Sequence, residues 1–126
     1  MDLVEIANAL VAHCRNGTER EALDTLYADN AASVEALPFG GRPQETVGKE
    51  GITGKHDWWD SAFEVTGGDV VGPFVHMPDR FAVRFSVQGK DKASGETFDM
   101  NEVAIYTVAD GKIVREEFYN EPMPMG

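Results

Sequence analysis

Apolar residues recur at helical spacing through the first part of the chain. A first amphipathic helix is expected to begin after Asp2, which suits an N-cap, and to end at Asn16-Gly17, with an apolar face of Leu3, Ile6, Ala7, Leu10, Val11 and Cys14. Thr18 stands three residues before Glu21, the spacing of a capping box, and predicts a second helix. That helix would bury Ala22, Leu23, Leu26 and Tyr27. Alternation over residues 32–36 then predicts a short strand.

A loop and a third helix are predicted next. Residues 37–48 hold two prolines and three glycines, which favours a loop. The third helix is expected from about Glu50 to Phe63, with an apolar stripe of Ile52, Trp59 and Phe63. His56 lies on the same stripe, so it points towards the interior in this interpretation.

The second half of the chain alternates between apolar and polar residues, as strands do. One strand is expected to begin at Val65 and to break at Gly67-Gly68, and another covers residues 70–77. Residues 80–88 alternate strictly, and Phe81, Val83, Phe85 and Val87 share one face. Residues 97–109 and 112–120 form two more strands around Asp110-Gly111, a strong hairpin signal.

A regular hairpin at Asp110-Gly111 fixes which residues share a face. One face holds Val103, Ile105, Thr107, Val114, Glu116 and Phe118, with Asn101 opposite Asn120 at its far end. This face is the more apolar and is predicted to line the interior, where Glu116 stands out as a costly carboxylate. The other face, with Glu102, Tyr106, Arg115, Glu117 and Tyr119, suits solvent or a partner subunit.

Composition narrows the classes of partner. Three helices followed by mostly antiparallel strands indicate a single α+β domain over residues 1–126. The net charge of −11 and the lack of a basic cluster argue against nucleic acid and against anionic membranes. Cys14 is the only cysteine, and the N-terminal stretch lacks a basic segment before its apolar residues. We therefore expect a cytoplasmic protein.

Three segments resemble the SnoaL-like family, which belongs with the ketosteroid isomerases to the nuclear transport factor 2-like superfamily. They are LVAHCRNGTEREALDTLYADNAASVEA, GITGKHDWWDSAF and EVAIYTVADGKIVREEFYN, in this order. The resemblance implies a cone-shaped, curved antiparallel sheet wrapped around three helices, also called a cystatin-like roll. It further implies an apolar pocket for a small molecule, no cofactor, and a homodimer that pairs through the outer face of the sheet.

The resemblance also suggests catalytic residues. The proton-shuttling carboxylate of the isomerases aligns with Glu35, or with Ala36 if one residue is inserted. The two oxyanion donors of the isomerases align with Leu10 and Val103, neither of which is able to donate. The acid–base residue of the polyketide cyclases falls near Glu116 and Phe118, of which only Glu116 titrates.

Each candidate has a plainer interpretation. His56 serves as an acid, base or donor in the pocket, or as a satisfied core histidine. Glu35 is the shuttle or a solvated strand residue, and Glu116 is a base or the partner of a nearby cation. The histidines show no metal-ligand spacing. The residues predicted to contact a ligand are Trp59, Phe63, His76, Phe81, Val83, Phe85, Asn101, Val103, Ile105, Phe118 and Asn120.

Two functions remain open at this point. The first is a cofactor-free acid–base enzyme that isomerises, cyclises, hydrates or dehydrates a small apolar molecule. The second is a binding or dimerisation module without catalysis, which the missing oxyanion donors favour.

Overall fold

The computed structural model describes residues 1–121 and begins with two short helices. Helix α1 (Leu3–Asn16) starts with the expected N-cap, because the Asp2 carboxylate accepts the Glu5 N–H at 2.9 Å and the Glu5 carboxylate accepts the Asp2 N–H at 3.1 Å. It ends at Gly17, whose φ of 71° suits a glycine. Helix α2 (Glu19–Leu26) follows, but Thr18 forms no side-chain cap. The Thr18 hydroxyl instead lies 2.7 Å from His13 Nδ1.

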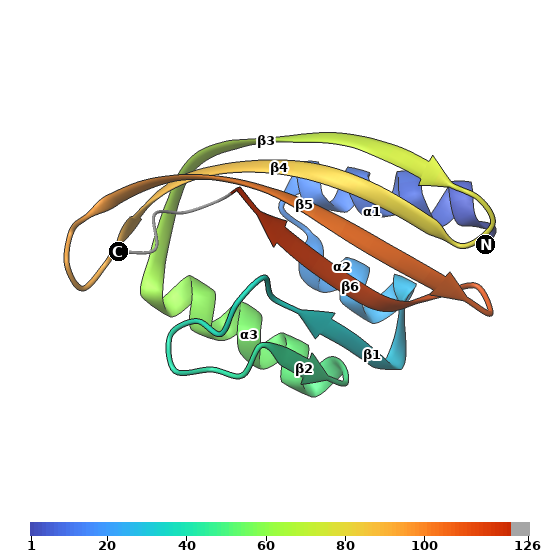
Figure 1. Ribbon diagram of the computed structural model, residues 1–126, viewed down its shortest axis with the longest axis horizontal. Coiled ribbons are helices and arrows are strands. Elements are labelled where there is room, and N and C mark those ends of the chain that lie inside the picture. The colour runs from blue at the N-terminus through green and yellow to red at the C-terminus, as the bar shows by residue number, and fades with distance from the viewer. Residues whose placement is uncertain (122–126) are drawn as a thin grey trace.

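A six-stranded sheet and a third helix make up the rest of the molecule (Figure 1). The strands lie in the order β2-β1-β6-β5-β4-β3, and every neighbouring pair is antiparallel except β1 and β6. Their bounds are Tyr27–Val34 (β1), Glu45–Val47 (β2), Phe63–His76 (β3), Arg80–Asp91 (β4), Thr97–Ala109 (β5) and Lys112–Asn120 (β6). Helix α3 (Lys49–Ala62) connects β2 to β3.

Three element boundaries differ from the sequence-based expectation. Strand β1 begins at Tyr27, directly after α2, and β2 lies within the expected loop. The expected break at Gly67-Gly68 is wrong, because β3 runs unbroken from Phe63 to His76. Its register with β4 shifts between Val65 and Gly67 and again between Val71 and Phe74, so bulges absorb the irregular residues without ending the strand.

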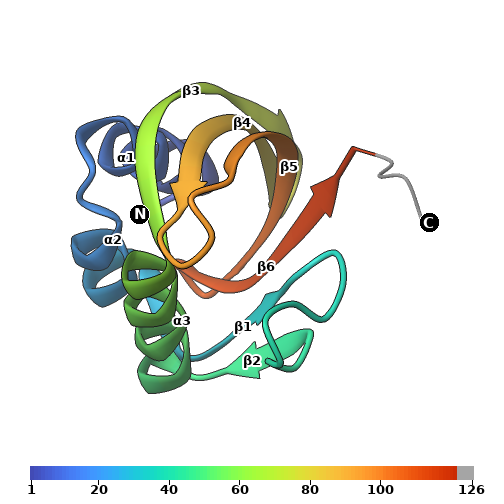
Figure 2. The ribbon, with the colours of Figure 1, turned by 90° about the vertical axis from the view of Figure 1, so that its left-hand side faces the viewer.

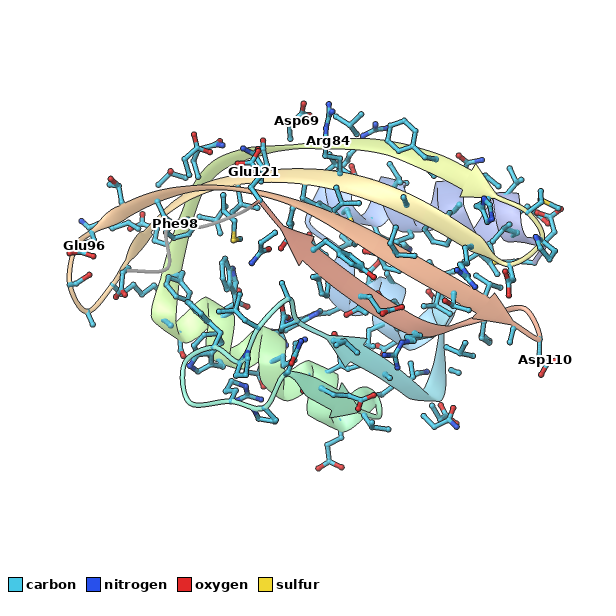
Figure 3. All side chains as sticks on the ribbon, in the orientation of Figure 1. Asp69, Arg84, Glu96, Phe98, Asp110 and Glu121 are labelled. Carbon is cyan, nitrogen blue, oxygen red and sulfur yellow. The ribbon has the colours of Figure 1, made fainter. Side chains whose placement is uncertain are left out.

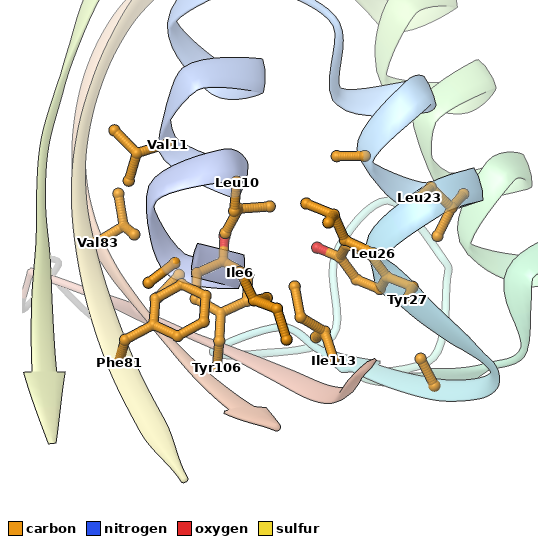
Figure 4. Close-up of a cluster of buried hydrophobic side chains, with 14 of the residues drawn as sticks. Ile6, Leu10, Val11, Leu23, Leu26, Tyr27, Phe81, Val83, Tyr106 and Ile113 are labelled. Atoms are coloured by element: carbon orange, nitrogen blue, oxygen red, sulfur yellow. The ribbon is translucent and has the colours of Figure 1, made fainter. Parts of the chain in front are cut away.

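The curved sheet packs around α1 at one end (Figure 4). Ile6, Leu10 and Val11 of α1 are 0–2% exposed and belong to one cluster with Phe81, Val83, Tyr106 and Ile113 of the sheet. Burying each such side chain contributes about 1.5–3 kcal/mol to folding. In Figure 2 the unclosed sheet curls over, and the three helices lie along its open side. This arrangement is the expected α+β cone.

The last hairpin has the expected turn but a different register. Asp110 and Gly111 have φ values of 52° and 74°, which a two-residue hairpin turn requires. Beyond the pair of Val108 with Ile113, however, Thr107 pairs with Arg115 and leaves Val114 as the extra residue of a bulge.

The bulge changes which residues of β5 face inward. Glu116 lies opposite Tyr106 rather than Ile105, and Phe118 lies opposite Ala104. Ala104 and Tyr106 are 0% and 2% exposed, whereas Val103 is 37% exposed. The predicted face is therefore wrong for β5 and right for Glu116 and Phe118 of β6. No helix among residues 1–121 has the length and apolar character needed to cross a membrane.

Candidate functional site

Glu116 is the one buried carboxylate among the described residues, at 5% exposure. It points from β6 into the concave side of the sheet, where two hydroxyl groups donate to it. Ser33 on β1 donates to its Oε2 at 2.6 Å, and Tyr27, at the start of the same strand, donates to its Oε1. The parallel pairing of β1 with β6, which sets Ser33 beside Glu116, produces this arrangement. A buried carboxylate held by two donors is a stable acceptor.

A lysine on α3 extends this hydrogen-bond network towards solvent. Lys55 Nζ lies 2.7 Å from Ser33 Oγ and 2.7 Å from Glu35 Oε1. Because an ammonium group only donates, it occupies the acceptor side of the Ser33 hydroxyl and directs its proton to Glu116. The chain of contacts is therefore Tyr27, Glu116, Ser33, Lys55 and Glu35, and it runs from a buried hydroxyl to a carboxylate that is 37% exposed.

A tyrosine and a partly buried cysteine near Glu116 keep their protons. Burial, and next the Glu116 carboxylate, raise the pKa of Tyr27 well above its usual value, so Tyr27 remains a donor. Burial, and next the charges of Glu19 and Glu116, raise the pKa of the Cys14 thiol to about 12. Cys14 packs against the core as expected and is no thiolate nucleophile.

Glu102 is the carboxyl group of the concave face whose pKa lies near neutral pH. Burial, and next the negative charges of Glu35 and Glu116, raise the pKa of its carboxyl from 4.5 to about 7, although Lys55 lowers it. The side chain is half-buried and has no hydrogen-bond partner among the described residues. A carboxyl with such a pKa is able both to accept and to donate a proton at pH 7.

Apolar and amide side chains surround Glu102 on the concave face. In the sheet register Glu102 lies between Phe85 on β4 and Asn120 on β6. Phe118 follows on the same face of β6, and Lys55 Nζ lies 5.6 Å from the centroid of its ring. These side chains are half-buried, whereas Phe81 and Val83 further along β4 are 1% and 0% exposed. Solvent therefore reaches the concave face around Glu102 and is excluded from the core beside it.

An aromatic cluster closes the end of the concave face where β4 turns into β5. Trp59 and Phe63 have ring centroids 4.6 Å apart, and Phe98 lies 6.0 Å from Trp59 and 5.6 Å from Phe63. Trp58 and Phe39 pack against the outer side of Phe63. A hollow of about 530 Å³ lies on that outer side of the cluster and is not lined by Glu102 or Lys55. Its lining is Phe39, Gly40, Trp58, Ser61, Ala62, Phe63, Asp91, Lys92 and Ala93.

Several predicted ligand residues lie away from this face. Phe81 and Val83 are inside the packed core. Asn101, Val103 and Ile105 alternate with the inward residues of β5 and face outward. Asn101 helps line a second, outer hollow of about 300 Å³, with Asp69, Val71, Arg84, Phe85, Ser86 and Glu121. Figure 3 shows Asp69, Arg84 and Glu121 on this side of the sheet. Neither hollow is lined by Glu116.

Neither His56 nor His76 forms a hydrogen bond with Glu35, Glu102 or Glu116. His76 is exposed and ends β3 opposite Arg80, which in turn pairs with Thr107 near the β5–β6 turn. Phe98 and Asp110 mark opposite ends of β5 in Figure 3, so His76 and the aromatic cluster are far apart. His56 is half-buried on α3, and no side-chain hydrogen bond links it to another residue of 1–121.

Sequence reasoning missed Glu102, Lys55, Ser33 and Tyr27. A regular hairpin places Glu102 on the outer face, and the bulge at Val114 that turns it inward has no clear sequence signal. Lys55 was available as a signal, since it stands three residues after Ile52 and four before Trp59 on the inward stripe of α3. Ser33 stands two residues after buried Ala31 on β1, so the two side chains share the inner face of that strand.

Comparisons with known proteins agree with this architecture. The family described as SnoaL-like domain matches residues 7–116. A crystal structure of a candidate SnoaL-like polyketide cyclase from Mesorhizobium loti has 40% identity and a TM-score of 0.87, and the match covers 94% of this chain and 99% of that chain. No curated protein matches the chain.

More distant structures share the fold alone. A candidate isomerase from Bacillus subtilis has 19% identity and a TM-score of 0.73, with 97% of this chain and 91% of that chain covered. A protein from Catenulispora acidiphila with a ketosteroid isomerase-like fold, in complex with trimethylamine, has 21% identity and a TM-score of 0.69 over 94% of this chain and 86% of that chain.

Proposed function

The chain belongs to the SnoaL-like domain family, and from this premise we propose that it is a cofactor-free enzyme that moves a proton within a small apolar molecule. The molecule would bind on the concave face, between the aromatic cluster and the Glu116 network. An isomerisation, a cyclisation, a hydration or a dehydration would fit such a site. The similarity to a candidate polyketide cyclase supports the cyclisation.

One observation carries the proposal. Glu102 is a half-buried carboxyl whose pKa is raised to about 7, and it lies between Phe85 and Asn120 without a hydrogen bond from its side chain to any residue of 1–121. A general base or acid works best with a pKa near the working pH. Proton transfer by such a group raises the reaction rate about 10²–10⁴-fold. Glu102 is thus the proton-transfer group of the proposal.

The other polar groups have supporting roles. Tyr27 and Ser33 hold Glu116, whose charge helps to raise the pKa of Glu102. Lys55 supplies the one cation of the network and lies over Phe118. Glu35 and Ser33 take two of its three N–H groups, and the third would donate to a neutral substrate oxygen on which partial negative charge develops. It would partly compensate for the oxyanion donors missing at Leu10 and Val103.

Proton exchange at carbon tests this proposal directly. The protein is incubated in D₂O with an apolar aryl methyl ketone, and deuterium uptake beside the carbonyl is followed by NMR. We expect saturable exchange whose rate rises with pH around an inflection of about 7, because Glu102 must be ionised to accept the proton. Glu102→Gln should lose about 10²-fold or more of the exchange rate.

Glu117→Gln is the matched control, since Glu117 lies on the outer face of β6 and pairs with Arg115. It should exchange at the rate of the original protein. Equal exchange in the Glu102→Gln and Glu117→Gln variants would contradict the role of Glu102. Ketone-induced thermal stabilisation without any exchange would favour the non-catalytic binding module.

A further inference from the structure

The concave site has an unusual charge balance for a small-molecule site. Three carboxyl groups, Glu35, Glu102 and Glu116, act on one another here, and Lys55 is the cation that acts on them. Glu102 receives no compensating contact from Lys55, which lies with Glu35 and Ser33 instead. When Glu102 is ionised, the four groups together carry a net charge of −2, the sum of three negative charges and one positive charge.

Lys55 is already engaged and has little capacity for a ligand anion. Its Nζ lies 2.7 Å from the Glu35 carboxylate and 2.7 Å from the Ser33 hydroxyl, and its side chain is only 13% exposed. The ring of Phe118 lies beneath it at 5.6 Å. Glu35 and Ser33 take two of the three N–H groups of Lys55, so a carboxylate or phosphate of a ligand would have to share the ammonium with Glu35 and would lie close to that like charge.

The rest of the wall favours an apolar and cationic group over an anionic one. Phe118, Trp59 and Phe98 present aromatic rings, whose faces attract cations and repel anions. The whole chain carries a net charge of −11, and its field would concentrate cations and deplete anions near the surface. His56 follows Lys55 on α3, and the two acidic residues further along this helix, Asp57 and Asp60, pair with Arg20.

We infer that this site selects its ligand by charge and takes a small apolar molecule that bears an amine, in preference to one that bears a carboxylate or a phosphate. The inference rests on the proposed location of the site and names the substrate class for it. The amine would lie near Glu102, and the apolar body would lie against the aromatic cluster. Acyl phosphates, nucleotides and carboxylic acids are then poor ligands.

Three probes with the same aromatic body test the inference. Binding of naphthylmethylamine, naphthylmethanol and naphthoate is measured by tryptophan fluorescence and calorimetry at about pH 8 and about pH 6. At about pH 8 we expect the amine to bind about tenfold or more tighter than naphthoate, with naphthylmethanol between them. At about pH 6 Glu102 is largely protonated, and the advantage of the amine over naphthylmethanol should shrink.

Variants locate the effect within the site. Glu102→Gln should reduce the ratio of amine to naphthoate affinity, and Glu117→Gln on the outer face should leave it unchanged. Lys55→Met removes the cation that acts on Glu102 and Glu35 and should increase this affinity ratio. This second variant keeps the test informative if Glu102→Gln folds poorly. Circular dichroism confirms that each variant is folded.

The outcomes separate this inference from the proposed function. Naphthoate binding as tightly as the amine, no binding of any probe, or an unchanged ratio in both Glu102→Gln and Lys55→Met would overturn charge selection. The proton-exchange experiment uses an uncharged ketone and reads catalysis independently. Exchange that depends on Glu102, combined with tight naphthoate binding, would reject charge selection and leave the proposed function standing.

Discussion

Glu102 and Glu116 lie on the same concave face, yet their surroundings give them different properties. Glu116 has two hydroxyl donors and is almost fully buried, so its charge is compensated by directed hydrogen bonds. Glu102 is less buried, has no such donor, and is affected by the charge of Glu116. Two carboxyls in different environments can divide their roles, one as a fixed charge and the other as the group that exchanges protons.

The raised pKa of Glu102 predicts a specific dependence of stability on pH. The folded protein binds a proton at Glu102 more tightly than the unfolded chain, whose carboxyl titrates near 4.5. The stabilisation from this proton is complete below about pH 4.5 and is lost as the pH rises through about 7. Glu102→Gln carries no charge at any pH and should lack this loss.

Denaturant unfolding at about pH 4 and about pH 8 measures the effect. Relative to Glu102→Gln, the original protein should lose about 1–3 kcal/mol of unfolding free energy between these two pH values. Glu117→Gln, on the outer face, should follow the pH dependence of the original protein. If the difference in unfolding free energy between Glu102→Gln and the original protein is the same at both pH values, Glu102 has the same pKa in the folded and the unfolded protein.

The segment between β1 and β2 packs against Trp58 of α3 through Phe39, Gly40 and Arg42. Gly40 has a φ of 61°, and a Cβ atom at this position would lie 2.4 Å from the Trp58 ring. Neighbouring Gly41 has a φ of 73° but has no atom within 4 Å of such a Cβ. The two glycines therefore separate the cost of backbone conformation from the cost of contact with α3.

Substitution of these glycines tests how closely the segment packs. Gly41→Ala should cost about 1–2 kcal/mol, because alanine is strained at positive φ. Gly40→Ala should cost more and should also change the tryptophan fluorescence, since Trp58 has to move. Unfolding curves and emission spectra of the two variants give the comparison. Equal costs and unchanged emission would mean that the segment does not rest on Trp58 in solution.

The elements were largely predictable from the sequence, but their register was not. Apolar spacing located α1, α3, β4, β5 and β6 to within a few residues, because each buries one regular face. The bulge at Val114 depends on how β6 bends to pair with both β5 and β1, which is a property of the whole sheet. One extra residue moved Glu102 and Tyr106 inward and moved Val103 outward.

The candidate site was predictable to the extent that it lies on β6. Glu116 was recognised as an unusual carboxylate in an apolar pattern, and the structure places it inside with two donors. Its partners come from β1 and α3, which are distant in sequence and meet it only through the parallel β1–β6 pairing. A pattern within one strand carries no information about such partners.

The outer face of the sheet carries exposed apolar side chains that suit a contact with a second subunit. Val103 and Tyr119, which pair across β5 and β6, are 37% and 55% exposed and lie beside the Arg115–Glu117 ion pair. The expected dimer face included Glu102 and Tyr106, which the bulge places inside. The corrected outer face, with Val103, Ile105, Arg115, Glu117 and Tyr119, still combines apolar and charged groups in the manner of a subunit interface.

We therefore expect a homodimer that forms through this corrected face. Each subunit carries a net charge of −11, so the two copies repel one another, and added salt should strengthen the dimer by screening that repulsion. Light scattering at micromolar concentration should give the mass of a dimer at about 0.3 M salt and a larger monomer fraction at about 0.02 M salt.

Val103→Glu should yield a monomer, whereas Val4→Glu, at an exposed position on α1, should remain dimeric. A monomer at both salt concentrations would exclude the dimer, and a dimer in the Val103→Glu variant would place the interface on another face.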